Sequence, residues 1–464
     1  MEQNTTYRDS VATIDEQGKR RWIFPKKPFG KFYDRRKALS YFLLLILFAT
    51  PYLKIGGQPV LMLNILERKF VIFGQIFWPQ DLHLFALTML VFILFIIIFT
   101  IVFGRMFCGW VCPQTIFMEM VFRRIEYAIE GDWSQQKRLA NMPWTREKLL
   151  KKGAKNLVFW FISFLIANTF LSYIIGYEAL WDIILDAPQN HVGGLISLVI
   201  FTSVFYLVFS KFREQVCTVV CPYGRLQDVL LDKDSLVVIY DKLRGEKRGK
   251  IAKGENREEA NKGDCIDCNQ CVNVCPTGID IRNGTQLECV NCTACMDACD
   301  FMMEKVNLPK NLIRYDSING IENNEGFKIT TRVKAYIVVL MVLLTILISM
   351  LFTRSEFETT VLRTRGTIFQ EVSEGVYSNI YDVSVLNKTN NDLDVELRVL
   401  EGNAEVKMIG DNLILKAQSE TQGKFMLLIK EEDFTNRKMN LVLGVYSNDE
   451  LIEKVETTFI TPTL

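Results

Sequence analysis

Five long apolar stretches constrain the fold of this chain more than any other feature. They cover residues 38–58, 84–104, 157–176, 194–212 and 335–353. Each comes close to the roughly 20 apolar residues that a helix needs to cross a bilayer. Backbone polar groups in hydrocarbon must pair within the segment, so we predict five transmembrane α-helices. The first stretch follows a long basic N-terminus without a small-residue cleavage site, so we expect it to be retained rather than removed as a signal peptide.

Lys and Arg are distributed unevenly among the segments that join these stretches. The basic segments are 1–37, 105–156 and the region after Lys211, whereas 177–193 has no Lys or Arg and 59–83 has only Arg68 and Lys69. The positive-inside rule therefore predicts that the basic segments, including 213–334, are cytoplasmic. Everything after the fifth stretch is then periplasmic, and we expect a multi-pass protein of a bacterial inner membrane. The net charge of +1 gives no reason to expect a nucleic-acid partner.

The C-terminal region, residues 354–464, has a different pattern. Runs such as VYSNIYDVSVL, LDVELRVL and KMNLVLGVYS alternate apolar and polar residues, and clusters of turn-forming residues separate them. This period-two pattern is typical of the antiparallel strands of a β-sandwich. The region has no cysteine and no catalytic spacing, so we predict a folded interaction module.

Eight of the 12 cysteines form two runs in the segment between the fourth and fifth stretches. The first run is Cys265-x2-Cys268-x2-Cys271-x3-Cys275 followed by Pro276, and the second is Cys289-x2-Cys292-x2-Cys295-x3-Cys299. In two-cluster ferredoxins the first three thiolates of a run bind one cubane and the fourth binds the other. We therefore predict one [4Fe–4S] cluster on Cys265, Cys268, Cys271 and Cys299, and a second on Cys289, Cys292, Cys295 and Cys275. A zinc ribbon, with two CxxC pairs, fits this spacing poorly. Asp300 stands where ferredoxins often have proline, which removes no ligand.

The other four cysteines form a short repeat at the ends of two apolar stretches. FGRMFCGWVCP at 103–113 contains Cys108 and Cys112, and REQVCTVVCP at 213–222 contains Cys217 and Cys221. The Cβ atoms of cysteines at i and i+4 on a helix are about 5–6 Å apart, which is too far for a relaxed disulfide but suits a shared soft ion or a cluster. The proline after each pair predicts a break in the helix at the second cysteine. We expect the second and fourth stretches to pack together, so that the four thiolates bind Cu(I).

Methionine and histidine offer few additional ligands. Met106, Met118 and Met120 could add thioethers, but we expect them to serve in packing. His83 and His191 lie at the outer ends of the second and fourth stretches, where we expect ordinary interfacial side chains rather than a shared metal site. Because neither lies within a span, haem b held between helices is disfavoured.

Together these motifs resemble the CcoG/FixG/RdxA family of cytochrome c oxidase accessory proteins. The resemblance rests on CGWVCPQTIFMEMVFRRIEYAIEGDW, REQVCTVVCPYGRLQDVL, GDCIDCNQCVNVCPTGIDIRNGTQLECVNCTACMDAC, LIRY and NIYDVSVLNKT. It implies an immunoglobulin-like C-terminal domain and a membrane cupric reductase, which supplies Cu(I) during assembly of cbb(3)-type cytochrome c oxidase. It also implies that copper is bound or reduced at Cys108, Cys112, Cys217 and Cys221.

The sequence thus predicts a polytopic α-helical membrane protein with an inserted 2[4Fe–4S] ferredoxin-like α+β domain and a C-terminal immunoglobulin-like β-sandwich. The expected segments are 1–37, the four-helix part 38–212, the cytoplasmic block 213–334 with its core at 255–310, the fifth helix 335–353, and the periplasmic domain 354–464. Expected partners are a cytoplasmic electron donor, a copper transporter or chaperone, and the oxidase assembly machinery, with a homodimer as an open assembly state. Two alternative functions remain: a NapH- or NosR-like membrane ferredoxin that exchanges electrons with quinone, and a non-catalytic copper chaperone or assembly scaffold.

Overall fold

The computed structural model describes residues 13–462 except for short gaps. The gaps are 15–16, 18, 66–68, 79–80, 253–256, 258, 325, 356, 367, 390, 411–412, 418 and 448. The first part of the predicted basic N-terminus and Arg68 of the 59–83 loop therefore lie outside the described residues. The chain forms two compact units, Met1–Leu347 and Ile348–Leu464.

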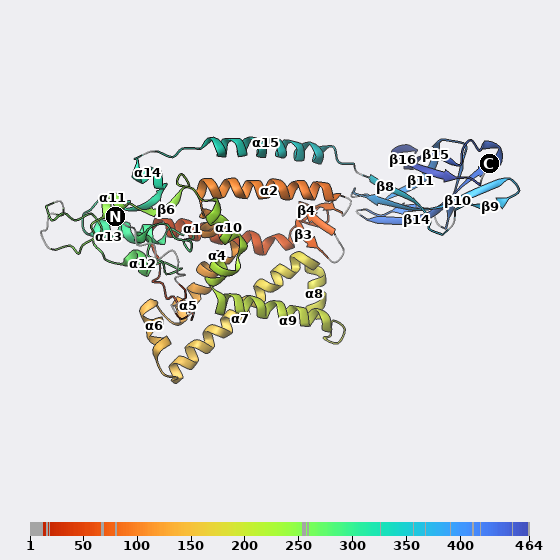
Figure 1. Ribbon diagram of the computed structural model, residues 1–464. Helices are drawn as coiled ribbons and strands as arrows, with labels where there is room; N and C mark the ends of the chain where they lie inside the picture. The colour runs from red at the N-terminus through yellow and green to blue at the C-terminus, as the bar shows by residue number, and fades with distance from the viewer. Residues whose placement is uncertain are drawn as a thin grey trace. The chain divides into compact units, whose positions relative to one another are not determined.

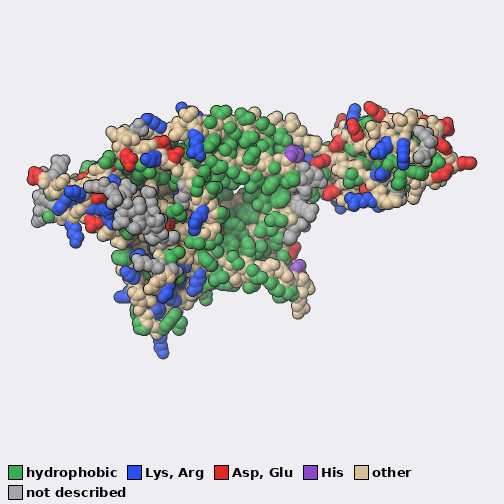
Figure 2. Space-filling view, viewed as in Figure 1, with side chains coloured by type: hydrophobic (Ala, Val, Ile, Leu, Met, Phe, Trp, Pro, Cys, Tyr) green, Lys and Arg blue, Asp and Glu red, His purple; other side chains and the backbone are tan. Residues whose placement is uncertain are grey.

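Four helices in the described part of the chain are long and apolar enough to cross a membrane. They are α2 (Leu82–Phe103), α7 (Arg146–Ile175), α9 (Val192–Leu207) continued by the π-helical turn η5 (Val208–Phe212), and α15 (Thr331–Phe352). Large apolar side chains on them face outward and are at least half exposed, among them Phe92, Ile200 and Val338. Figure 2 shows these side chains as a broad hydrophobic surface with few charged groups. Such a surface fits contact with lipid rather than water.

The first apolar stretch differs from its prediction. Helix α1 (Lys31–Ala49) is followed by the 3-10 turn η2 (Thr50–Tyr52) and by the hairpin of β1 (Lys54–Ile55) and β2 (Gln58–Pro59). The prediction of a helix through residue 58 is therefore wrong. Pro51 has no N–H to donate to a continuing helix, and Gly56 and Gly57 adopt positive φ angles of 59° and 84° in the turn of the hairpin. The apolar part of α1, 38–49, is about 18 Å long, which is shorter than the bilayer core of about 30 Å.

A small antiparallel sheet follows this hairpin. Its strands, in the order β3–β4–β5, are Leu61–Asn64, Lys69–Ile72 and Gln75–Phe77. In Figure 1 the sheet lies beside the start of α2, at the end of the membrane helices opposite the cysteine-rich part. Helix α1 leads toward this sheet, so α1 and the sheet together connect the two ends of the helical part.

Short helices join the membrane helices on the side of the cysteine motifs. They are α3 (Met106–Trp110), α4 (Pro113–Ile116), the π-helix η4 (Phe117–Phe122), α5 (Arg123–Ile129), α6 (Trp133–Asn141), the π-helix η6 (Val216–Val220) and α10 (Pro222–Leu230). At the opposite end, α8 (Tyr177–Leu185) joins α7 to α9 (Figure 1). Phe122 of η4 stacks on Phe209 of η5 at 4.5 Å between ring centroids and meets Phe159 of α7 edge-on at 4.8 Å. All three rings are fully buried, so this aromatic cluster fixes the first cysteine motif against α7 and η5.

The cysteine-rich part is an α+β unit, as predicted. Strands β6 (Val237–Tyr240) and β7 (Ile313–Asp316) pair antiparallel, and α12 (Gln270–Asn273) and α13 (Ala294–Lys305) lie between them in the sequence. The remaining elements are α11 (Lys242–Gly245), η7 (Ile281–Asn283) and α14 (Ile318–Glu322). Met303 of α13 packs with buried residues of both strands, so the helix and the sheet share one core.

Helix α1 is anchored to this unit at its N-terminus. The Asp297 carboxylate on α13 accepts hydrogen bonds from the backbone N–H of Phe32 at 3.1 Å and of Tyr33 at 2.8 Å. Gly30 precedes the helix with φ of 128°, and a Cβ there would lie 2.4 Å from Cγ of Asp297. A carboxylate at this position satisfies free N–H groups and interacts favourably with the helix dipole.

We expect Asp297→Ala to weaken the first turn of α1 by about 1 kcal/mol, because two backbone donors lose their acceptor. Amide hydrogen exchange at Phe32 and Tyr33 should then be roughly fivefold faster. Asp34→Ala is the control, because Asp34 is exposed and pairs only locally with Lys37 at 2.9 Å. Equal exchange in the two variants would contradict the capping role of Asp297.

The second unit, residues 348–464, consists of two antiparallel sheets. One has the strand order β12–β14–β10–β8 with β9 also paired to β10, and the other has the order β13–β11–β15–β16. The strands are β8 (Phe357–Arg363), β9 (Gln370–Ser373), β10 (Val376–Asn387), β11 (Leu393–Glu401), β12 (Glu405–Ile409), β13 (Leu413–Leu415), β14 (Glu420–Lys430), β15 (Lys438–Ser447) and β16 (Glu450–Ile460), with a 3-10 turn η8 (Glu431–Asp433). Tyr381 and Phe425 from one sheet and Leu443 from the other share the core between the sheets. The predicted β-sandwich is confirmed.

Candidate metal centres

A cavity in the cysteine-rich part, here called cavity A, is lined by Cys265, Cys268, Cys271 and Cys299. The first three cysteines lie on the loop before α12 and on its first turn, and Cys299 lies on α13. Apolar side chains, including Met303 and Leu312, complete the lining together with Asn269 and Arg282. These are the four cysteines that the spacing predicts for one cubane, and the structure brings them to one place.

A buried arginine holds the loop that carries these cysteines. Arg282 donates hydrogen bonds to Asp267 Oδ1 and Asn269 Oδ1 at 2.6 Å each, and to Asp280 Oδ1 at 2.8 Å. Asp267 and Asn269 adopt positive φ angles of 52° and 55°. Residues with such angles turn the backbone around a cavity, and the arginine, which itself lines cavity A, fixes that turn.

A second cavity, here called cavity B, is lined by Cys275, Cys289, Cys292 and Cys295. Asn291 and Thr293 in its loop have φ angles of 51° and 65°, two and four residues after the first cysteine of the run. Asp267 and Asn269 occupy the same positions after the first cysteine of the other run. The two runs therefore share one backbone conformation, in addition to their spacing.

Cavities A and B are adjacent and buried. Cys271 lines both of them. Burial raises the pKa of Cys271 and of Cys289 to about 12 each, and that of Cys292 to about 11. Without a cation these thiols stay protonated at neutral pH, whereas iron would hold them as thiolates.

The arrangement of the thiols fits a cluster better than a single ion. Among the described residues, no three His, Cys, Asp or Glu side chains are placed to hold one metal ion. In a cubane, each thiolate binds a different iron at a corner, so four thiols around a cavity are required rather than four around a point. Each of cavities A and B offers such a set within an apolar lining, and the two therefore fit [4Fe–4S] clusters.

The two CxxxCP motifs share a backbone conformation. Gly104 (φ 57°, ψ −134°) and Arg213 (φ 52°, ψ −124°) each end a membrane helix four residues before the first cysteine of the motif. The N–H of Cys112 donates to O of Phe107 at 2.9 Å, and that of Cys221 donates to O of Val216 at 2.8 Å. Both bonds span five residues, as in a π-helical turn, rather than the four of the regular helix that the i, i+4 argument assumes.

The predicted break at each proline is confirmed. Cys112 has ψ of 124° and Cys221 has ψ of 114°, and a new helix begins at Pro113 and at Pro222. Arg213 adopts a left-handed φ that glycine favours and that Gly104 adopts in the first motif. Strained positions of this kind often lie at functional sites, because the surrounding structure has to maintain them.

The structure brings Cys108, Cys112, Cys217 and Cys221 together in what we call the four-cysteine centre. Burial, followed by the neighbouring thiols of Cys112, Cys108 and Cys221, raises the pKa of Cys217 to about 12. Burial and the neighbouring thiol of Cys112 raise the pKa of Cys108 to about 11. Each pair therefore contributes to one shared environment.

The four-cysteine centre lies against cavity B. Cys108 packs on a buried apolar cluster that contains Val290 and Cys292. A Cβ added to Gly109 would lie 2.3 Å from the carbonyl oxygen of Val290, so only glycine permits this approach. The guanidinium of Arg105 donates to the backbone oxygens of Leu287, in the cavity B loop, and of Gly224, after the second motif.

A small cavity, here called cavity C, lies between the two motifs and the loop of cavity B. Its lining residues are Gln114, Thr115, Met118, Glu119, Arg213, Glu214, Cys217, Pro276, Thr277 and Val290. Of the three methionines considered above, Met118 shares this cavity with Cys217, whereas Met120 is buried and Met106 is half-buried. His191 pairs with Asp186 at 3.1 Å, and His83 is exposed at the start of α2.

A buried network of charges lies next to cavity C, and no sequence pattern described above predicts it. Arg213 donates to both carboxylate oxygens of Glu126, at 2.9 and 2.8 Å, and Arg123 pairs with Glu119 at 2.7 Å. Lys155 of α7 contacts Glu126 at 3.5 Å. The charged pattern FRRIEY at 122–127 could have indicated this network. Charged side chains that are buried beside a membrane helix need partners of opposite charge.

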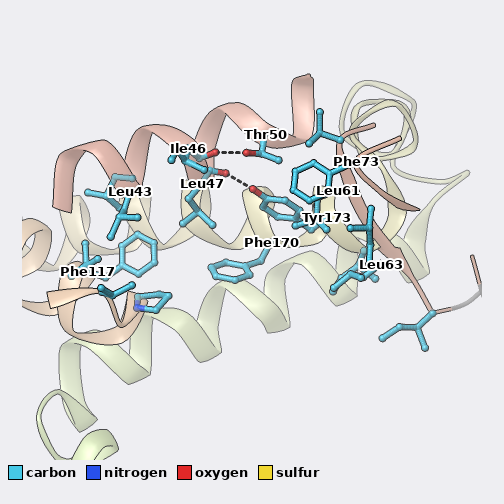
Figure 3. A pocket seen from close by; sticks show the side chains of 18 residues that line it. Leu43, Ile46, Leu47, Thr50, Leu61, Leu63, Phe73, Phe117, Phe170 and Tyr173 are labelled. Carbon is cyan, nitrogen blue, oxygen red and sulfur yellow. Dashed lines mark hydrogen bonds between the residues drawn. The ribbon is translucent and has the colours of Figure 1, made fainter. Parts of the chain in front are cut away.

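A cavity of about 760 Å³ lies within the membrane part. Figure 3 shows α1 on one side, with Leu43, Ile46 and Leu47, and α7 on the other, with Phe170 and Tyr173. The lining residues Val111 and Pro113 flank Cys112, so this membrane cavity reaches the four-cysteine centre. Its two polar groups are engaged: Tyr173 Oη donates to O of Leu47 at 2.8 Å, and Thr50 Oγ1 donates to O of Ile46 at 2.7 Å.

Comparison with known proteins agrees with these features. A family model described as a 4Fe-4S dicluster domain matches residues 212–318, and one described as a 4Fe-4S binding domain matches residues 85–138. A third, described as the Ig-like fold at the C-terminal of FixG, matches residues 347–462. Protein RdxA of Cereibacter sphaeroides is 32% identical over 400 residues, which cover 83% of each chain. The chain belongs to the FixG/RdxA family.

Other members of the FixG/RdxA family show the same relationship. Protein RdxB of Cereibacter sphaeroides is 31% identical over 404 residues, or 84% of each chain. Nitrogen fixation protein FixG of Rhizobium meliloti is 35% identical over 315 residues, which cover 66% of this chain and 59% of FixG. A crystal structure of a FixG-related protein from Vibrio parahaemolyticus matches 24% of this chain and 100% of that chain at 20% identity, with a TM-score of 0.21. As a family member with two matched 4Fe-4S domains, the chain is an iron–sulfur protein of the electron-transfer type.

Proposed function

We propose that this protein is a membrane-bound cupric reductase that supports assembly of a cbb(3)-type cytochrome c oxidase. The observation that carries the proposal is a continuous line of thiols. Cavity A shares Cys271 with cavity B, and Cys292 of cavity B belongs to the apolar cluster on which Cys108 packs. This line gives electrons a short route from the dicluster domain to the four-cysteine centre.

The residues of the chain have distinct roles in this relay. Iron–sulfur clusters, when bound in cavities A and B, supply one-electron storage and transfer. The apolar linings exclude water, and Arg282 holds the loop of cavity A. Arg105 connects the cavity B loop to both CxxxCP motifs and so fixes the separation of the two redox centres. A Cu(II) ion that reaches the four-cysteine centre accepts one electron from it and becomes Cu(I), the oxidation state that soft sulfur ligands favour.

The proposal includes a cytoplasmic electron donor for the dicluster domain. It places this domain on the cytoplasmic side of a bacterial inner membrane and the C-terminal domain in the periplasm. Lys and Arg side chains of the first unit gather at its dicluster end, which supports this orientation (Figure 2). A copper transporter or chaperone would then exchange copper with the protein, and a homodimer is compatible with this scheme.

We expect the reduced protein to form Cu(I) more than about tenfold more slowly in the variant Cys108→Ala/Cys217→Ala, because each motif loses a thiol. The measurement is the initial rate with a Cu(I)-specific chelator under anaerobic conditions, together with the iron content of the dicluster domain. Val219→Ala is the matched control, because Val219 lies between the two cysteines of the second motif and is 46% exposed. An unchanged rate in the double variant would refute the assignment, and stoichiometric Cu(I) binding without turnover would favour a scaffold.

The membrane cavity favours electron exchange with a quinone as a second candidate function. It is apolar, large enough for part of an isoprenoid chain, and adjacent to Cys112. Leu47→Trp would fill this cavity and should slow oxidation of the reduced protein by quinone in the absence of copper. Slow oxidation by quinone at the same rate in the wild type and in Leu47→Trp would exclude electron exchange with a quinone.

A further inference from the structure

We propose that the four-cysteine centre holds a third [4Fe–4S] cluster, with Cys108, Cys112, Cys217 and Cys221 as its ligands. The cluster would lie at the junction between the membrane helices and the dicluster domain. This assignment goes beyond the proposed reductase activity, because it holds whichever acceptor takes the electron. It also differs from the Cu(I) site that the sequence predicts for these thiols.

The first argument is a count of ligands. The segment 85–138, which matches a 4Fe-4S binding domain, contains only two cysteines, Cys108 and Cys112. A cubane in this class of protein takes four cysteine ligands. The eight cysteines of the dicluster runs already line cavities A and B. A cluster in this segment therefore needs Cys217 and Cys221.

The second argument is that the fold supplies those two thiols. The two motifs repeat the same backbone break at Gly104 and Arg213, and both bring the N–H of the second cysteine back to the carbonyl oxygen five residues earlier. The two motifs also meet directly, because Cys108 Sγ donates to Oε1 of Gln227 at 3.3 Å, on the helix α10 that follows Cys221. The two copies of the CxxxCP motif thus contribute two ligands each, and together they form a centre with four ligands.

The third argument concerns the spacing of the thiols. A single Cu(I) or Zn²⁺ ion needs its sulfur ligands about 2.3 Å away, so the thiols must converge on one point. Among the described residues no such convergence occurs, at the four-cysteine centre or in cavities A and B. The four thiols of the centre thus resemble the two dicluster sets in that they do not converge on one point.

The fourth argument is the surroundings of the centre. Buried cations lie beside it: Arg36 donates to O of Gly109 at 2.6 Å, and Arg105 donates to O of Gly224, just after the second motif. Positive charge of this kind stabilises a cluster with four thiolates, whose net charge is negative. Contact of Cys108 with the apolar cluster around Cys292 places the third cluster next to the one in cavity B, so the three form one line.

The test is the iron and acid-labile sulfide content of the full chain, purified anaerobically in detergent without added copper. We expect about twelve iron atoms per chain in the wild type and in Val219→Ala, and about eight in Cys217→Ser/Cys221→Ser. Mössbauer spectra should show the loss of one third of the cluster signal in the double variant. About eight iron atoms per chain in the wild type would overturn the proposal. This outcome does not depend on whether the double variant folds. Because the readout is iron rather than Cu(I) formation, this result is independent of the cupric reductase test.

Discussion

Gly109→Ala is expected to slow electron transfer from the dicluster domain to the four-cysteine centre by about 100-fold. The new Cβ would lie 2.3 Å from O of Val290 and 2.9 Å from O of Asn291. Both atoms are backbone of the cavity B loop, so neither can rotate away as a flexible side chain would. The first CxxxCP motif must shift, and Cys108 would lose its contact with the apolar cluster around Cys292.

The measurement for Gly109→Ala is the single-turnover rate at which Cu(II) reoxidises the chemically reduced protein. Gly153→Ala is the matched control, because a Cβ at this position of α7 meets no atom within 4 Å. It should leave the rate unchanged and stabilise the helix by about 0.5–1 kcal/mol. Iron content shows whether cavities A and B still load their clusters. A wild-type rate in Gly109→Ala would show that the close contact does not set the electron route.

Glu126→Ala is expected to destabilise the membrane unit by about 3–5 kcal/mol, because it leaves buried cations without their partner. Glu126 is 2% exposed and Arg213 is 5% exposed. Arg213 donates hydrogen bonds to both carboxylate oxygens of Glu126. Burial alone would raise the pKa of Glu126, but Arg213, Lys155 and Arg123 together hold it below the ordinary value. The stabilisation is therefore present above the ordinary glutamate pKa and is lost as the pH falls through the lowered one.

Thermal unfolding of the protein in detergent measures the effect of Glu126→Ala. The control is Glu147→Ala, which removes an exposed i,i+4 pair with Lys151 at 2.8 Å and should leave the unfolding temperature close to that of the wild type. Equal unfolding temperatures for the two variants would show that the buried network does not stabilise the region around Arg213. A large loss confined to Glu126→Ala would support its role in holding the second CxxxCP motif.

The parts of the fold that sequence patterns predict are those with local causes. Cysteine spacing predicted both sets of four thiols, because each run wraps its own loop and the exchange of the fourth ligand follows from the two-run pattern. Period-two alternation predicted the sandwich, because burial of one face of a strand depends on neighbouring residues. Hydropathy predicted five membrane helices, and four of them are long and apolar enough in the described part of the chain. The end of the first was placed wrongly, because Pro51 and Gly56 interrupt the helix despite the apolar character of that stretch.

Other features depend on segments far apart in the sequence. The membrane cavity forms where α1, α7 and the β3–β5 sheet meet, and none of these segments alone predicts a cavity. The approach of Gly109 to Val290 requires the relative position of two regions 181 residues apart, which no local pattern gives. The charge network depends on α5, α7 and Arg213 in the same way.

Freeze-quench EPR during one turnover tests the electron route through the four-cysteine centre most directly. Reduced, copper-free protein would be mixed with Cu(II), and the signals of the dicluster domain and of Cu(II) would be followed together. We expect both signals to decay together in the wild type and in Val219→Ala, whereas Cys217→Ser/Cys221→Ser keeps its reduced dicluster signal in the presence of Cu(II). Reoxidation of that variant at the wild-type rate would contradict the route.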